Sequence, residues 1–370
     1  MATSTTTTKT TPPISLPQAP RKPKPWHAHV TLDLLADIAN RSILHPFIAC
    51  LIPLCLRAVG TPATWLRFQV ACTYAIALTL HALFLHWGRR VAFGAARCVD
   101  LADEVVVVTG GARGLGLLVA EVYGMRGASV AVLDVVPGVE EELETKGIAY
   151  YRCDVGEREE VEEAYGRIEE DLGTPTILIN NAGVVNGKPL LELSPADLER
   201  NFRINLLAHF NTIQTFLPGM LDAQNGGTIV TVSSVLGKVG AACLSDYTAA
   251  KAGLIAMHTS LQAELKQSKK PGAKNIRTIL VAPGQLRTRL FGELETPSSF
   301  LAPIVEPVQV AQAIIRTVDA GEGGDISFPL YARWMEWMTV LPSGLQWIIR
   351  GLSGVDDAMN NFGVEKNKDA

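Results

Sequence analysis

The chain has 370 residues, 48% of them hydrophobic, and a formal net charge of −4, so it is long enough for a full core with residues to spare. It carries no basic patch of the nucleic-acid-binding type, and no nucleic-acid partner is expected. The six cysteines lack any paired spacing, which excludes a disulfide framework and a metal site and favours a reducing compartment.

Residues 1–30 are expected to form a disordered tail, because a stretch rich in Thr, Pro and Lys cannot bury a core. Residues 31–100 are interpreted as a membrane-anchoring region. Within it, the stretch 42–56 is apolar but short and contains Pro46 and Pro53, which fits a re-entrant or interfacial segment. A secretory signal is not expected, because no early apolar core is followed by a small-residue cleavage site.

The second apolar stretch, 68–87, is the candidate membrane span. Its 20 residues carry no formal charge, and at about 1.5 Å per residue they reach about 30 Å, the thickness of a bilayer's hydrocarbon core. Trp65 and Trp87 bracket it as an interfacial aromatic belt would. Residues 1–100 have a charge balance of +7 and the remainder −11, which fits anchoring beside anionic head groups. The anchor either spans once or forms a hairpin; alternatively, both stretches are helices packed on the catalytic domain.

Residues 109–116 read Thr-Gly-Gly-Ala-Arg-Gly-Leu-Gly and follow an unbroken apolar run. This order predicts a buried strand, a tight turn and a helix, and such a turn aims backbone N–H groups at one point, which suits a dinucleotide pyrophosphate. The next strand, 129–133, ends in Asp134, where a carboxylate takes the ribose hydroxyls and favours NAD. Arg113 would instead suit the 2′-phosphate of NADP, which remains the alternative cofactor.

The rest of the domain alternates between strands and helices of 10–20 residues. This alternation predicts an α/β fold with a doubly wound parallel sheet (Rossmann type) over residues 101–330. Strands are expected at 148–153, 176–179, 228–232, 277–281 and 325–329, and helices at 157–172, 195–221, 245–265 and 308–319.

Tyr247 and Lys251 form the second candidate constellation. Residues i and i+4 share one face of a helix, so the phenol and the ammonium should lie together. A free phenol titrates near about 10, too high for a base at neutral pH, and a nearby lysine favours the phenolate and lowers its pKa. Ser234 ends an expected strand, which places its hydroxyl at the carboxyl edge of the sheet, where ligands bind.

Together these residues resemble the short-chain dehydrogenase/reductase family over about residues 103–330. The resemblance implies four catalytic positions: Asn205, Ser234, Tyr247 and Lys251. It also implies these cofactor-binding positions: Thr109, Gly110, Arg113, Gly114, Leu115 and Gly116 in the turn; Asp134; Asp154 and Val155; Asn181, Ala182 and Gly183; Tyr247 and Lys251; and Pro283, Gly284 and Thr288.

By the same resemblance, Tyr247 is the general acid/base and Lys251 lowers its pKa and binds the nicotinamide ribose. Ser234 orients the substrate oxygen, and Asn205 holds a water that links the lysine to solvent. Two of the implied positions have simpler explanations. In the simpler explanation, Asn205 is solvated or caps a helix, and Asp154 is the N-cap of the helix that follows.

All six tryptophans lie outside residues 101–330. Trp334, Trp337, Met338 and Leu341 fall at helical spacing, so the segment 331–370 is expected to contain an amphipathic helix followed by a tail. Either this helix packs on the core or on a partner subunit, or it lies at the membrane surface over the substrate entrance.

A short-chain dehydrogenase with an N-terminal apolar region resembles the membrane-anchored retinol and 17-beta-hydroxysteroid dehydrogenases. The resemblance implies an NAD(P)-dependent oxidoreductase that interconverts a hydroxyl and a carbonyl on a retinoid, steroid or long-chain substrate. It also implies the endoplasmic reticulum or a lipid droplet, a catalytic domain facing the cytosol, and a homodimer. The apolar segment 285–307 should shape the substrate pocket. Arg287 and Arg289 either meet a polar head of the substrate or solvate the loop, and solvation is the favoured interpretation. The alternatives are an NADPH-dependent reductase of 3-keto lipids and a non-enzymatic nucleotide-binding membrane or droplet protein.

Overall fold

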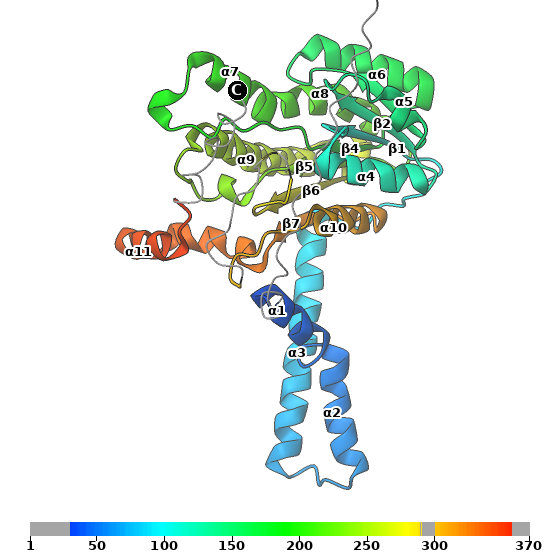
Figure 1. The fold of residues 1–370 in the computed structure, drawn as a ribbon. Coiled ribbons are helices and arrows are strands. Elements are labelled where there is room, and N and C mark those ends of the chain that lie inside the picture. Colours follow the sequence, from blue (N-terminus) through cyan, green and yellow to red (C-terminus); the bar gives the residue numbers. More distant parts are fainter. Residues whose placement is uncertain (1–29, 289, 291–299, 357–370) are drawn as a thin grey trace, which may run out of the picture.

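The computed structural model describes residues 30–288, 290 and 300–356 (Figure 1). Seven parallel strands form one sheet in the order β3-β2-β1-β4-β5-β6-β7, which confirms the predicted doubly wound fold. The strand order reverses between β1 and β4, and the crevice above their carboxyl ends is where such sheets bind ligands. The strands are β1 (Val105–Thr109), β2 (Ser129–Asp134), β3 (Ile148–Arg152), β4 (Ile177–Asn180), β5 (Gly227–Val232), β6 (Ile276–Pro283) and β7 (Gly324–Phe328).

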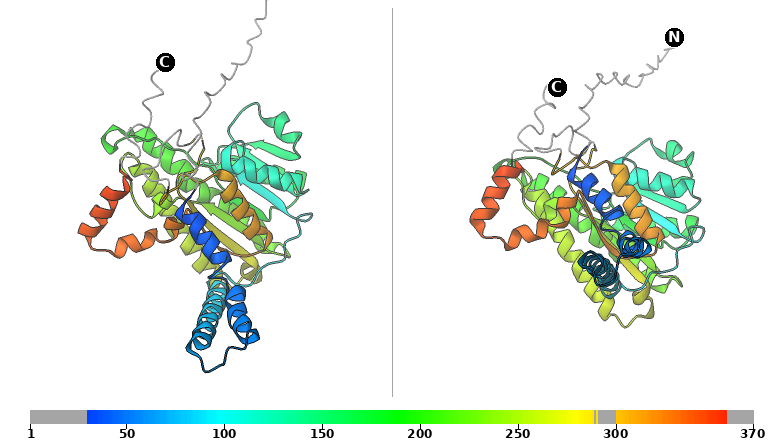
Figure 2. Two further views of the ribbon diagram at one scale, coloured as in Figure 1. Left: turned by 60° about the horizontal axis from the view of Figure 1, so that its bottom comes forward. Right: turned by 90° about the horizontal axis from the view of Figure 1, so that it is seen from below.

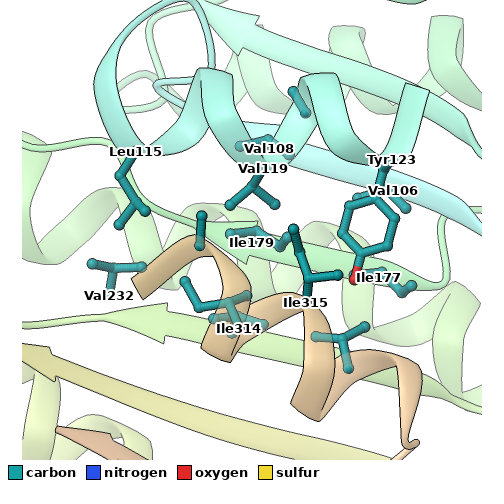
Figure 3. Packing of buried hydrophobic residues seen from close by; sticks show 14 of the residues in the cluster. Val106, Val108, Leu115, Val119, Tyr123, Ile177, Ile179, Val232, Ile314 and Ile315 are labelled. Carbon is teal, nitrogen blue, oxygen red and sulfur yellow. The ribbon is translucent and has the colours of Figure 1, made fainter. Parts of the chain in front are cut away.

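Both faces of the sheet are covered, which is why its central strands read as continuous apolar runs. In β1, Val106 and Val108 pack beneath α4 (Gly114–Met125) and α10 (Pro307–Asp319), as Figure 3 shows. The alternate residues Val105 and Val107 join the core on the opposite face, under α6 (Arg158–Leu172) and α8 (Ala208–Asp222). The remaining domain elements are α5 (Glu140–Glu144), η2 (Leu190–Glu192), α7 (Pro195–Phe202), η4 (Val235–Gly237), α9 (Ser245–Gln267) and η5 (Pro271–Asn275).

The helical stretch predicted over 195–221 is interrupted. It consists of α7, a π-helical turn at Arg203–Leu207 and α8. A π turn widens the backbone spacing and often occurs at functional sites. Asn205 lies inside this turn, so the irregularity falls on a residue that the sequence had already singled out.

The N-terminal region forms three helices: α1 (Leu32–Arg41), α2 (Pro46–Ala58) and α3 (Leu66–Phe93). Helices α2 and α3 pack along each other as a hairpin that projects away from the sheet domain (Figures 1 and 2). The alternative that both apolar stretches pack on the catalytic domain is therefore wrong. Helix α3 is long and apolar enough to cross a membrane, and α1 with α2 meets the same criterion as a pair bent by 50°.

A buried ion pair joins the hairpin to the sheet. Arg97 follows α3 and pairs with Glu104 at 2.7 Å, and the two side chains are only 2% and 4% exposed. The Arg97 Nε also donates to the Thr228 hydroxyl in β5 at 2.8 Å. Its backbone N–H donates to the Gly321 carbonyl at 2.9 Å. These contacts fix where the hairpin leaves the domain.

The chain after β7 forms η6 (Leu330–Arg333), η7 (Met335–Val340) and α11 (Ser343–Ser353). The helix predicted through 334–341 is thus a 3₁₀ helix over Met335–Val340, and the α-helix begins only at Ser343, after Pro342. Trp334, Trp337 and Trp347 are 62%, 65% and 68% exposed, so these side chains do not pack on the core. The segment lies along the edge of the domain from which the hairpin projects (Figures 1 and 2).

Candidate active site

The glycine turn is held in place by the two residues that follow β4. The Thr109 Oγ1 accepts hydrogen bonds from the amides of Asn181 and Ala182 at 3.0 and 3.1 Å. In return, the Asn181 Nδ2 donates to the carbonyls of Thr109 and Gly110, both at 3.1 Å. The side chains of Thr109 and Asn181 are occupied by these hydrogen bonds. They therefore fix the shape of the turn and do not offer free polar groups to a ligand.

The glycines are required by close approach and by conformation. A Cβ at Gly110, whose φ is +62°, would lie 2.8 Å from the Ala182 Cα, and one at Gly116 would lie 2.5 Å from the Gly110 carbonyl oxygen. Gly114, with φ +58°, would instead place a Cβ 3.8 Å from the Thr288 methyl group. The structure therefore brings Thr288 beside the turn. The amino end of α4 points into the same space, so the residues present fit a pyrophosphate.

Asp134 ends β2 beside this turn. Its Oδ2 accepts from the Ala112 N–H at 3.0 Å and its Oδ1 from the Val135 N–H at 2.8 Å. The carboxylate is therefore fixed at the strand end, where a ribose would lie. Arg113 is exposed at the N-cap of α4, on the same turn.

Asp154 is not the N-cap of the following helix, because α6 is capped by Glu157. The Asp154 carboxylate instead accepts from the Gly156 N–H at 2.9 Å and pairs with Arg203 at 3.2 Å. The Val155 and Leu115 side chains are buried in the two cores. At these two positions only the backbone can face a cofactor.

The four predicted catalytic residues come from three elements that meet at the carboxyl edge of the sheet. Tyr247 and Lys251 lie one turn apart on α9, with the Lys251 Nζ 5.8 Å from the centre of the phenol ring. Ser234 follows β5, and its hydroxyl is hydrogen-bonded to the phenol. All four residues, Asn205 included, are at most 5% exposed.

Asn205 is fully buried, so the explanations by solvation or helix capping are wrong. Its Oδ1 accepts from the Val184 N–H at 3.0 Å and its Nδ2 donates to the Val184 carbonyl at 2.8 Å. A Cβ at Gly183 would lie 3.0 Å from that Oδ1 and 3.8 Å from the Lys251 Nζ. Gly183, Asn205 and Lys251 therefore share one small space.

Pro283 and Gly284 complete the site at the end of β6. The Ser234 hydroxyl donates to the Pro283 carbonyl at 3.5 Å. Arg287 pairs with Glu306 at the surface at 3.2 Å, in keeping with the expected solvated role, while Arg289 lies outside the described residues.

A family model for the short chain dehydrogenases matches residues 104–298. The chain is 32% identical to an uncharacterized oxidoreductase of Saccharomyces cerevisiae over 256 residues, covering 69% of this chain and 83% of the relative. It is 32% identical to epidermal retinol dehydrogenase 2 of Mus musculus over 277 residues, covering 73% and 88%. Retinol dehydrogenase 10 of Rattus norvegicus is 35% identical over 252 residues, covering 58% and 72%.

The chain belongs to the short-chain dehydrogenase family. Members are oxidoreductases that act on CH–OH groups with NAD or NADP, so this chain is an enzyme of that class. The family match runs from residue 104 to residue 298, so the helices α1 to α3 and the chain from α10 onward lie outside the matched residues.

Burial controls the electrostatics of this short-chain dehydrogenase. It raises the pKa of Tyr247 to about 12, with the Ser234 hydroxyl acting in the opposite direction. It lowers the pKa of Lys251 to about 8. In the protein without cofactor or substrate, the pKa of Tyr247 is therefore raised, whereas the sequence predicted that it would be lowered. The reason is that desolvation of the phenolate outweighs the Ser234 hydrogen bond. The Lys251 ammonium donates to the Val232 carbonyl at 3.0 Å.

Two features of this dehydrogenase were not anticipated from the sequence. Lys238, just after the Ser234 turn, pairs with Glu336 at 2.9 Å and so ties the C-terminal segment to the catalytic loop. Tyr331 reaches the end of β6, because a Cβ at Gly284 would lie 3.1 Å from its hydroxyl. No sequence pattern distinguishes these two residues from surface side chains.

Proposed function

We propose that the protein is a membrane-anchored dehydrogenase that interconverts a hydroxyl and a carbonyl on an apolar, lipid-like substrate. The observation that carries this proposal is the combination of two parts in one chain. The first is a buried Asn205, Ser234, Tyr247 and Lys251 constellation at the carboxyl edge of the sheet. The second is an apolar helical hairpin clamped to the same domain through Arg97.

In the proposed mechanism, the chain positions the substrate and handles the proton. A nicotinamide supplies or accepts the hydride when bound. In the oxidation direction Tyr247 takes the proton from the substrate hydroxyl, and in reduction it gives a proton to the carbonyl oxygen. The Ser234 hydroxyl donates to the same substrate oxygen and holds it within reach of the phenol. Lys251, whose pKa is about 8, is charged at neutral pH, and its ammonium would stabilise the phenolate that forms when Tyr247 gives up its proton.

Asn205 has a positioning role in this mechanism. Its carboxamide is tied to both backbone groups of Val184, which keeps the π turn open beside Lys251. As the family resemblance implies, Asn205 would hold the water through which Lys251 returns a proton to solvent.

NAD is the proposed cofactor. The Asp134 carboxylate is fixed by two backbone amides at the end of β2, so it would accept from ribose hydroxyls and repel a 2′-phosphate. The exposed Arg113 favours the second candidate, an NADPH-dependent reductase of 3-keto lipids. Comparison of the KM values for NADH and NADPH decides between the NAD-dependent dehydrogenase and the NADPH-dependent reductase.

Membrane anchoring is supported by what the hairpin exposes. Its outward side chains are large and apolar, and they include Phe47, Leu54, Ile76, Leu80, Leu83, Phe84 and Trp87, each more than half exposed. Water would solvate such a surface poorly, whereas a bilayer would cover it. The segment with η7 and α11 lies at the same edge of the domain (Figure 1), and its exposed tryptophans suit the head-group region. We place the enzyme on the endoplasmic reticulum or a lipid droplet, with its catalytic domain in the cytosol.

The substrate class follows from the anchor and from the relatives. Two relatives are named retinol dehydrogenases, and an anchored site takes substrate that partitions into lipid. The test is turnover of retinoid, steroid and long-chain alcohols and ketones by the protein in liposomes, with each cofactor in turn. Selective turnover of apolar substrates supports the proposal. A protein that binds NADH but turns over no member of the panel would instead be a nucleotide-binding membrane protein.

A further inference from the structure

Helix α1 connects the hairpin to the substrate side of the active site. At its amino end, the Leu32 N–H donates to the Phe300 carbonyl at 3.0 Å, in the segment expected to shape the pocket. One residue later, the Asp33 Oδ1 accepts from the Leu330 N–H at 2.6 Å. The other end of α1 leads through residues 42–45 into α2, and Tyr74 of α3 donates to the Ile43 carbonyl.

The hydrogen bond between Asp33 and Leu330 lies one residue from Tyr331, whose side chain reaches the end of β6 in the active site. Tyr331 follows Leu330, and its hydroxyl lies against Gly284. The Asp33 carboxylate is close enough to contribute to the raised pKa of that phenol, after burial. Gly284 follows Pro283, whose carbonyl accepts from the Ser234 hydroxyl. A continuous set of contacts thus runs from the hairpin through α1 to the catalytic serine.

We propose that residues 330–331 form one wall of the substrate pocket, and that Asp33 is a positioning residue that couples the α2–α3 hairpin to this wall. The membrane-related part of this proposal rests on the proposed function. The charged carboxylate makes a short hydrogen bond to a backbone N–H, which is about twice as strong as a neutral one. When lipid fixes the hairpin, α1 holds the wall in the position that accepts a substrate arriving from the bilayer.

The same helix offers a matched control. Asp37 lies one turn further along α1 and pairs with Arg41 of the same helix at 2.9 Å, where both side chains are more than half exposed. Asp33→Ala removes the acceptor for Leu330, Asp33→Asn keeps an oxygen at the same place, and Asp37→Ala changes the charge of α1 without touching the wall.

The experiment compares these variants of the full chain in phosphatidylcholine vesicles. We measure KM and kcat for a long-chain alcohol in the vesicles and for a short, water-soluble alcohol. Asp33→Ala should raise KM for the vesicle-borne alcohol about tenfold, the effect of losing one hydrogen bond to a charged group, and change KM for the soluble alcohol much less. Asp33→Asn should recover most of the loss, and Asp37→Ala should behave as the wild type. Equal effects on both alcohols would mean that Asp33 only supports the fold and would overturn the proposal.

A second readout does not depend on turnover. Amide hydrogen exchange of residues 330–334 should accelerate in Asp33→Ala but not in Asp37→Ala. If the wild type turns over no alcohol, the proposed function fails, yet this exchange difference still supports the coupling. Unchanged exchange in Asp33→Ala overturns the coupling, whatever the enzyme turns over.

Discussion

Removal of one partner of the buried Arg97–Glu104 pair should destabilise the catalytic domain strongly. The two side chains are 2% and 4% exposed, so water cannot solvate the Arg97 guanidinium once the Glu104 carboxylate has been removed. Breaking such a pair costs about 3–5 kcal/mol. At about 2–4 °C per kcal/mol for a domain of this size, Glu104→Gln should lower the Tm by roughly 6–20 °C.

The double variant Arg97→Met/Glu104→Leu tests the cause of this loss. It removes both charges and refills the space with apolar atoms, so it should recover more than half of the lost stability. Recovery is incomplete because the Thr228 hydroxyl loses its contact with the Arg97 Nε. Thermal unfolding followed by near-ultraviolet circular dichroism at one fixed scan rate measures all variants.

An exposed ion pair gives the control. Arg158 and Glu162 are 51% and 53% exposed, and such pairs contribute at most about 1 kcal/mol. Glu162→Ala should therefore leave the Tm nearly unchanged. A Tm for Glu104→Gln that matches the Glu162→Ala value, or a double variant less stable than Glu104→Gln, would refute the reasoning.

Three further predictions concern the cofactor turn, cofactor choice and pH. Gly116→Ala should weaken NADH binding about tenfold or more, because a Cβ there lies 2.5 Å from the Gly110 carbonyl oxygen and overpacking costs about 1–3 kcal/mol. Gly166→Ala, where a Cβ meets nothing within 4 Å, should leave the fluorescence titration unchanged. Asp134→Ala should raise the Kd for NADH about tenfold and lower that for NADPH, and parallel changes in both would contradict the assigned role. The pKa of Lys251 is lowered by burial to about 8, so its buried charge destabilises the cofactor-free fold below that pH, and this cost declines between pH 8 and about 10. The Tm advantage of Lys251→Met over the wild type should shrink across that range, and an advantage independent of pH would show that the charge is not the cause.

Much of the fold was predictable because its signals are local. The Val105–Val108 run, the glycine turn and Asp134 follow one another within about 30 residues, and each sets its own backbone conformation. The parallel, doubly wound arrangement of the sheet then follows from the alternation of strands and helices. The π turn at Asn205 was not predictable, since a π turn and a regular helix share the same hydrophobic pattern.

The site was less predictable wherever it depends on contacts between distant segments. The environment of Tyr247 depends on burial beneath other elements, and this burial reverses the expected direction of its pKa shift. Asp33 lies 297 residues from Leu330, its hydrogen-bond partner. A single acidic residue in an amphipathic helix gives no indication of such a partner. The C-terminal segment does contain a helix, but its position was wrong: residues 335–340 form a 3₁₀ helix, and the α-helix begins at Ser343, after Pro342.

The most direct test of the proposed function is NAD-linked oxidation of a retinoid or long-chain alcohol by the full chain in liposomes, compared between wild type and Tyr247→Phe. We predict turnover by the wild type, and a loss of several orders of magnitude in the variant with NADH affinity retained, because only the proton-transferring hydroxyl has been removed. Near-normal turnover by Tyr247→Phe, or no turnover of any apolar alcohol or ketone by the wild type, would contradict the account.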